Sequence, residues 1–126
     1  MTISLRQMIA GLLLALPATT PGLAAGDVAR GKYLVTIGIC EGCHSPRDAQ
    51  EQIIAPKRLA GGGRIGGLTT PNLTPDVETG LGAWSEADIV AALRNGHRPD
   101  GSAVRPPMGI FFYRSLSDQD ALSIAA

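Results

Sequence analysis

The chain has 126 residues, balanced charge (11 Lys and Arg against 11 Asp and Glu) and five aromatic side chains beside 16 glycines and nine prolines. This length predicts one domain. The absence of a clustered basic face excludes a typical nucleic-acid-binding protein, and two cysteines are too few for a disulfide-rich scaffold. So few large side chains make a poor core, and we expect another group to complete it.

The first 25 residues have the pattern of a secretory signal peptide. Arg6 precedes a nine-residue apolar stretch at 8–16, and small residues at 22–25 allow cleavage after Ala24 or Ala25. Nine apolar residues fall short of the roughly 20 that a transmembrane helix needs, and an uncleaved N-terminal anchor is the alternative interpretation. We therefore expect a periplasmic domain at 26–126 that lacks a transmembrane span and has one more acidic than basic residue.

Three short helices are predicted, each after a residue whose side chain can accept a hydrogen bond from the first helical turn. The second and third have a carboxylate three residues after that cap, which is the pattern of a capping box, and glycine ends the first and second. The predicted caps are Asp27, Ser85 and Ser117, the predicted ends of the first two helices are Gly38 and Gly96, and the third runs through Leu122 and Ile124.

The remaining segments are predicted as loops. Residues 45–83 and 97–113 lack helical periodicity and are interrupted by glycine and proline, and no segment shows the alternation of a strand. The fold class is therefore predicted as all-α, with three short helices and long loops. A compact domain seldom holds so long an irregular segment unless the segment wraps around something.

The most informative motif follows the first predicted helix, where Cys40 and Cys43 are followed directly by His44. C-x-x-C-H is the attachment signature of a c-type haem. In a helical turn the two sulfurs can face the same side, each can add to a vinyl group of the haem, and the adjacent imidazole can bind the iron. The motif therefore favours one covalently bound haem c.

Three other interpretations share these cysteines. A thioredoxin-like redox pair would need a βαβ context, and no strand pattern is found nearby. A structural zinc site needs four ligands, but His97 is the only distant donor. A plain disulfide across C-x-x-C would close very little chain entropy. Haem is the favoured interpretation.

A second axial ligand is predicted at Met108, the only methionine in 26–126. Haem proteins of this kind use a thioether or an imidazole opposite the first histidine, and Pro106 and Pro107 stiffen the loop that carries Met108. The alternative for a lone methionine is core packing. His97 could compete as a ligand, but its polar turn favours a solvent-exposed side chain.

Taken together, these features resemble a monohaem class I cytochrome c, and more narrowly the haem modules in cytochrome subunits of bacterial periplasmic dehydrogenases. The resemblance covers nearly all of 26–126 and rests on segments 40–47, 70–76, 79–84, 98–101 and 107–108. It implies a small cytochrome c fold in which Cys40 and Cys43 carry the thioethers, His44 is the proximal ligand and Met108 the distal ligand.

The resemblance also bears on other positions. It implies that Trp84 donates its indole N–H to a haem propionate, with ordinary core packing as the alternative, and that Asn72 helps to order its loop. The chain departs from the family where Gly109 follows Met108 in place of a frequent proline, which implies a looser loop. The family's third helix continues into an aromatic–leucine pair, whereas this sequence stops at Ala126, so a C-terminally truncated fragment is one expectation.

The function expected from these features is single-electron transfer between a dehydrogenase and a downstream acceptor. The chain would be an electron carrier or a haem subunit of an oxidoreductase complex, without catalytic residues. Its expected partners are redox proteins: a periplasmic or membrane-bound dehydrogenase, an oxidase or another cytochrome. The alternatives are a ligand-binding or peroxidase-like haem protein with a labile Met108, and a haem-free C-x-x-C protein.

Overall fold

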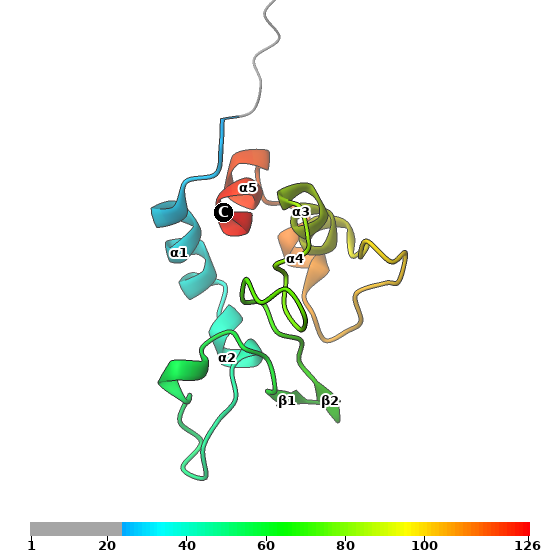
Figure 1. Ribbon diagram of the computed structural model, residues 1–126. Coiled ribbons are helices and arrows are strands. Elements are labelled where there is room, and N and C mark those ends of the chain that lie inside the picture. The colour runs from blue at the N-terminus through cyan, green and yellow to red at the C-terminus, as the bar shows by residue number, and fades with distance from the viewer. Residues whose placement is uncertain (1–23) are drawn as a thin grey trace, which may run out of the picture.

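Figure 1 shows the computed structural model of the chain, which describes residues 24–126. The predicted signal peptide, 1–25, lies outside the described residues except for its last two positions and stays a prediction. The elements in chain order are α1 Val28–Ile37, α2 Cys40–His44, the 3-10 helix η1 Ala55–Lys57, β1 Arg64–Ile65, β2 Leu68–Thr69, α3 Glu86–Asn95, α4 Ile110–Tyr113 and α5 Asp118–Ala125. Within this part of the chain, no helix has both the length and the apolar character needed to cross a bilayer.

The three helices predicted from the sequence are confirmed as α1, α3 and α5. Their caps form as expected: the side chains of Asp27, Ser85 and Ser117 accept hydrogen bonds from the backbone N–H groups of Arg30, Asp88 and Asp120, at 2.9, 3.2 and 3.0 Å. In α3 the capping box is complete, because the Asp88 carboxylate also accepts from the Ser85 backbone N–H. The box predicted for α5 is only half formed, because the Asp120 carboxylate binds Arg30 instead of the Ser117 backbone. α3 ends at Gly96, whose φ of 70° lies in the left-handed region that favours glycine.

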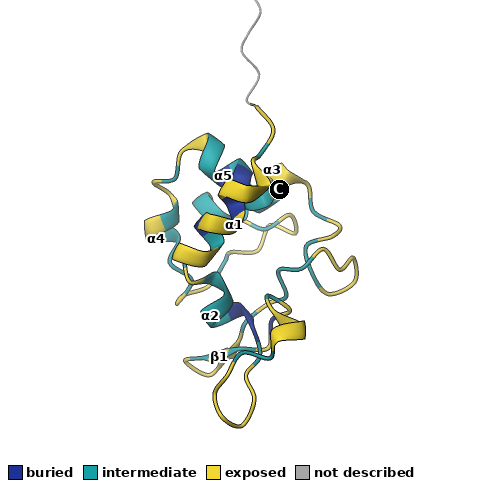
Figure 2. Cartoon of the chain, turned by 90° about the vertical axis from the view of Figure 1, so that its left-hand side faces the viewer, coloured by how far each residue is buried: buried dark blue, intermediate teal, exposed yellow. Residues whose placement is uncertain are grey.

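The helical core is the crossing of α1 and α5. Gly31 is buried there, and a Cβ at this position would lie 1.8 Å from the Ser123 carbonyl oxygen, so only glycine allows the two backbones to approach this closely. Leu34 and Ala121 are the buried hydrophobic residues of the described chain. Figure 2 shows buried residues at this crossing and, apart from it, just after α2.

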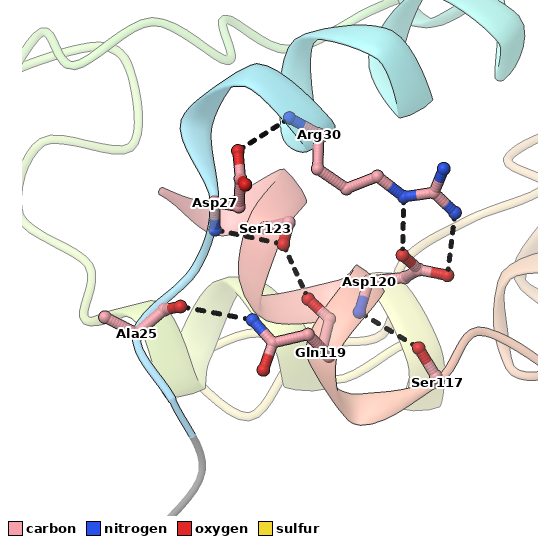
Figure 3. A network of polar contacts seen from close by, with 7 residues as sticks. All are labelled: Ala25, Asp27, Arg30, Ser117, Gln119, Asp120 and Ser123. Carbon is pink, nitrogen blue, oxygen red and sulfur yellow. Dashed lines mark hydrogen bonds and ion pairs between the residues drawn. The ribbon is translucent and has the colours of Figure 1, made fainter.

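A polar network joins the start of the described chain to α5 (Figure 3). The backbone N–H of Asp27 donates to Ser123 Oγ at 3.1 Å, and this hydroxyl donates in turn to the Gln119 carbonyl at 2.7 Å. Arg30 makes a two-pronged ion pair with Asp120, through Nε at 2.9 Å and Nη2 at 3.3 Å. Because Ser123 is fully buried, its two hydrogen bonds satisfy a hydroxyl that would otherwise be costly to bury.

We expect the Arg30–Asp120 pair to make the stability of the folded chain depend on pH in the acidic range. The hydrogen bond from Arg30 holds the pKa of the Asp120 carboxyl below its ordinary value. The pair therefore stabilises the folded chain above the carboxyl's unfolded pKa of about 4, and this contribution is lost as the pH falls through the folded pKa. In urea unfolding between pH 3 and pH 7, the Asp120→Asn variant is expected to be less stable than wild type at pH 7 and to approach it at pH 3. An equal difference at every pH would contradict this explanation.

The segments predicted as loops contain three unexpected elements: the short 3-10 helix η1, a hairpin and α4. β1 and β2 form an antiparallel hairpin, and Gly66 and Gly67 make its turn with φ values of 56° and 80°. α4 lies within the stretch 97–113 that was expected to be irregular. The fold is therefore mostly helical with one short sheet, rather than strictly all-α. Each strand is only two residues long, too short for alternation to be visible in the sequence.

Candidate functional site

The Cys40–His44 segment forms α2, a single helical turn that follows α1 almost directly. The chain changes direction at Ile39, whose φ of 57° is left-handed. Both cysteines are free thiols and half-buried, whereas His44 is buried, with only 7% of its surface exposed. The structure thus brings three of the four predicted site residues together in one turn.

A backbone carbonyl orients the imidazole of His44. Its Nδ1 lies 2.9 Å from the carbonyl oxygen of Pro71. Because a carbonyl can only accept, Nδ1 must carry the hydrogen, and in the neutral ring Nε2 then keeps a lone pair for a metal. This is the usual support for a metal-binding histidine, since the bond to the first nitrogen fixes both the tautomer and the ring orientation.

The long loop after α2 packs against the back of the same turn. The backbone N–H of Gly61 donates to the His44 carbonyl at 2.8 Å, and Thr70 Oγ1 donates to the Cys43 carbonyl at 2.8 Å. A Cβ on Gly63 would lie 2.0 Å from that same Cys43 oxygen. The loop therefore satisfies the last carbonyls of α2 and holds the turn in place, which a five-residue helix could not do alone.

Burial raises the pKa of the Cys40 thiol, and the neighbouring Cys43 raises it further. The first cysteine of a thioredoxin-like pair has the opposite property, because its pKa is lowered so that a reactive thiolate forms. The surroundings of Cys40 thus disfavour the thioredoxin-like interpretation. In the part of the chain that the structure describes, no cluster of three or more His, Cys, Asp or Glu side chains could hold a metal ion.

Met108 lies apart from α2 in the sequence, at the turn that leads into α4. Its backbone N–H donates to the Arg105 carbonyl at 3.2 Å, its carbonyl accepts from Ile110 at 2.9 Å, and its side chain is half-buried. α4 in turn contacts the residue that ends α1, because Tyr113 Oη donates to the Gly38 carbonyl at 3.2 Å. α4 thus connects Met108 to the end of α1, two residues before Cys40, and the binding of iron by Met108 stays a prediction.

The other candidate residues have different outcomes. The prediction that Asn72 orders its loop is confirmed: its amide donates to Thr79 Oγ1 at 2.9 Å, and its carbonyl oxygen accepts from the backbone N–H of Thr74 at 2.8 Å. His97 is exposed, as its polar turn predicted. Trp84 is half-buried and lines a groove of about 280 Å³ beside the end of α5. Its indole N–H has no hydrogen-bond partner among residues 24–126, so both interpretations of Trp84 stay predictions.

Sequence reasoning missed three contributors to the site. The Pro71 partner is a backbone carbonyl, which no side-chain pattern identifies. Thr70 and Tyr113 act through contacts with residues far away in the sequence. The Gly61–Gly63 run was a usable signal, because consecutive glycines often mark a place where another backbone approaches closely.

No protein-family profile matches the chain. Among individual proteins, it is 31% identical to a diheme cytochrome c-type protein of Cereibacter sphaeroides, over 96% of this chain and 47% of the relative. It is 43% identical to the cytochrome c subunit of a quinone alcohol dehydrogenase of Gluconobacter oxydans, over 70% and 20%. It is 35% identical to the cytochrome c subunit of gluconate 2-dehydrogenase of Pantoea cypripedii, over 79% and 22%. The chain thus spans between about a fifth and about half of the length of these relatives.

Proposed function

This chain belongs to the c-type cytochromes, and on that premise we propose that it is an electron-transfer module that carries one covalently bound haem c. Cys40 and Cys43 are the attachment residues and His44 is the proximal ligand. The observation that supports the proposal is the hydrogen bond from His44 Nδ1 to the Pro71 carbonyl, which leaves the Nε2 lone pair available to a metal. Two free thiols in the same helical turn are the groups that this cofactor needs for covalent attachment.

The residues fit the group in a second respect. Leu34 and Ala121 are the buried hydrophobic residues of the described chain, so a large apolar ring would supply core that the side chains lack. Each thiol would add across one vinyl group, with the sulfur bonding to one carbon and the hydrogen to its neighbour, so that nothing is oxidised or released. When bound, the haem supplies one-electron chemistry through its iron.

We propose Met108 as the distal ligand. It is the only methionine in 26–126, and its backbone is held by two hydrogen bonds at the turn before α4. A thioether paired with histidine raises the reduction potential relative to harder ligand sets. If His44 and Met108 both held the iron, no position would remain on it for a substrate, which would favour electron transfer over catalysis.

The cellular role follows from the predicted leader and from the relatives. We propose that residues 1–25 are a cleavable signal peptide, that 26–126 form the cytochrome domain, and that it works in the periplasm. Two relatives are cytochrome c subunits of dehydrogenases. By analogy, this module would accept electrons from a dehydrogenase and pass them to another redox protein, either as a free carrier or as a subunit.

The ligands are tested by replacing Met108 with alanine in the holoprotein. Wild type is expected to stain for haem on a denaturing gel and to show a low-spin ferric spectrum with a weak thioether band in the near infrared. Met108→Ala should lose that band, become high-spin and bind CO rapidly. Its potential should fall by roughly a hundred millivolts, since axial ligands spread haem potentials over about 0.8 V.

His97→Ala is the control, because it removes the other candidate ligand from an exposed position and should leave the spectrum unchanged. A wild-type protein that is high-spin and binds CO would instead support the ligand-binding or peroxidase-like alternative. A gel without a haem-stained band would support the haem-free alternative.

A further inference from the structure

Tyr113 makes a contact that the proposed electron transfer does not itself require. Its hydroxyl donates to the Gly38 carbonyl at 3.2 Å and joins residues 75 positions apart. A Cβ on Gly38 would lie 3.4 Å from Cys40 Sγ and 3.8 Å from Tyr113 Cε1. The tyrosine ring and the first thiol of the motif therefore both lie close to Gly38, the residue that ends α1.

Backbone hydrogen bonds within α4 connect the same tyrosine to the loop of Met108. The Gly109 carbonyl, next to Met108, accepts from the backbone N–H groups of Phe112 and Tyr113 at 2.9 and 3.3 Å. α4 has only four residues and no side-chain cap, so it depends on tertiary contacts to hold its shape. A displacement of Tyr113 would thus displace the loop of Met108.

Tyr113 also differs from its neighbours on α4. Phe111 and Phe112 are 74% and 75% exposed and pack edge to face on each other. Tyr113 is half-buried against the corner between α1 and α2. Among the three aromatic side chains of this helix, Tyr113 is therefore the one that attaches α4 to the segment carrying the cysteines.

We propose that Tyr113 is a positioning residue that keeps Met108 at the iron by tying α4 to Gly38. The inference rests on the proposed role of Met108 as distal ligand. Met108 and His44 would bind opposite sides of one iron, so the loop and α2 must keep a fixed separation. A loop that can move away from α2 would hold Met108 on the iron less tightly than a fixed loop. The Tyr113–Gly38 hydrogen bond restricts that movement.

The experiment measures how readily imidazole displaces Met108 from the ferric holoprotein. Tyr113→Phe removes the hydroxyl and keeps the ring. A neutral hydrogen bond contributes about 0.5–1.5 kcal/mol. Because imidazole must displace Met108, its apparent affinity rises by the same factor by which the Met-bound state loses stability. We therefore expect the variant to bind imidazole roughly 3- to 10-fold more tightly and to show a weaker thioether band. Tyr33→Phe is the matched control, because Tyr33 is the other tyrosine and lies exposed on α1.

A double variant separates positioning from a general effect on the fold. In a Met108→Ala background there is no thioether to hold, so adding Tyr113→Phe should leave imidazole affinity unchanged. An equal gain in both backgrounds, or no gain in either, would overturn the inference. If Met108→Ala removes the band while Tyr113→Phe behaves as wild type, the ligand assignment stands and the role of Tyr113 fails. If Met108→Ala keeps the wild-type band, the ligand assignment itself fails.

Discussion

Replacing Gly31 by alanine is expected to destabilise the folded holoprotein by about 3 kcal/mol, the upper end of the usual range for overpacking. The added Cβ would lie 1.8 Å from the Ser123 carbonyl oxygen and 2.7 Å from its carbon. Both are backbone atoms of α5, so no side-chain rotation can relieve the overlap and the two helices must separate. In a domain of this size the loss corresponds to a melting temperature lower by roughly 12 to 24 °C.

The sign of this result is informative, because helix propensity alone predicts the reverse. Alanine is favoured over glycine inside a helix by about 1 kcal/mol, so a variant limited by propensity would melt at a higher temperature. Lys32→Ala, at the next and exposed position of α1, serves as the control and should melt close to wild type. A Gly31→Ala protein at or above the wild-type melting temperature would show that the helices do not cross this closely.

The second large effect is expected at Gly63, behind the Cys40–His44 turn. A Cβ there would lie 2.0 Å from the Cys43 carbonyl oxygen and 3.0 Å from Thr70 Oγ1, so Gly63→Ala must push the loop away from α2. The hydrogen bond of Thr70 to Cys43 should break, and that of His44 to the adjacent Pro71 should break with it. We expect a stability loss of about 3 kcal/mol together with a disturbed haem spectrum.

Gly63→Ala differs from Gly31→Ala in what it changes besides stability. Gly31 lies at the crossing of α1 and α5, so its variant should keep the wild-type spectrum while it remains folded. The Gly63 variant should show altered axial ligation under the same conditions, since the partner of a ligating histidine tunes metal binding by 10- to 100-fold. Arg64→Ala, at the neighbouring exposed position, is the control. A normal spectrum in folded Gly63→Ala would contradict the role assigned to the loop.

The helix boundaries could be predicted because their causes are local. Asp27, Ser85 and Ser117 cap helices through bonds to N–H groups three residues away, and Gly96 ends one through its own φ. The C-x-x-C-H motif is also contained in five consecutive residues. Signals of this kind are complete within a short window of sequence.

The parts that could not be predicted depend on residues distant in the sequence. The Pro71 carbonyl accepts from an imidazole 27 positions earlier, and Tyr113 donates to a carbonyl 75 positions earlier. Nothing in the neighbourhood of either residue specifies such a partner. α4 was missed for the same reason, because a single turn has no periodicity and is held by its tertiary contacts. The assignment of Met108 to the iron remains a prediction of the sequence and its family.

The contact between Asp27 and Ser123, 96 residues apart, also sets an order of events during biosynthesis. A ribosome releases the N-terminus first, so α1 and the Cys40–His44 turn that follows it emerge long before α5. Until Ser123 arrives, α1 has no helix against which to bury Gly31 and Leu34. α1 therefore gains its packing partner only once residues 118–125 are present, which makes the pairing of α1 with α5 a long-range step in folding rather than a local one.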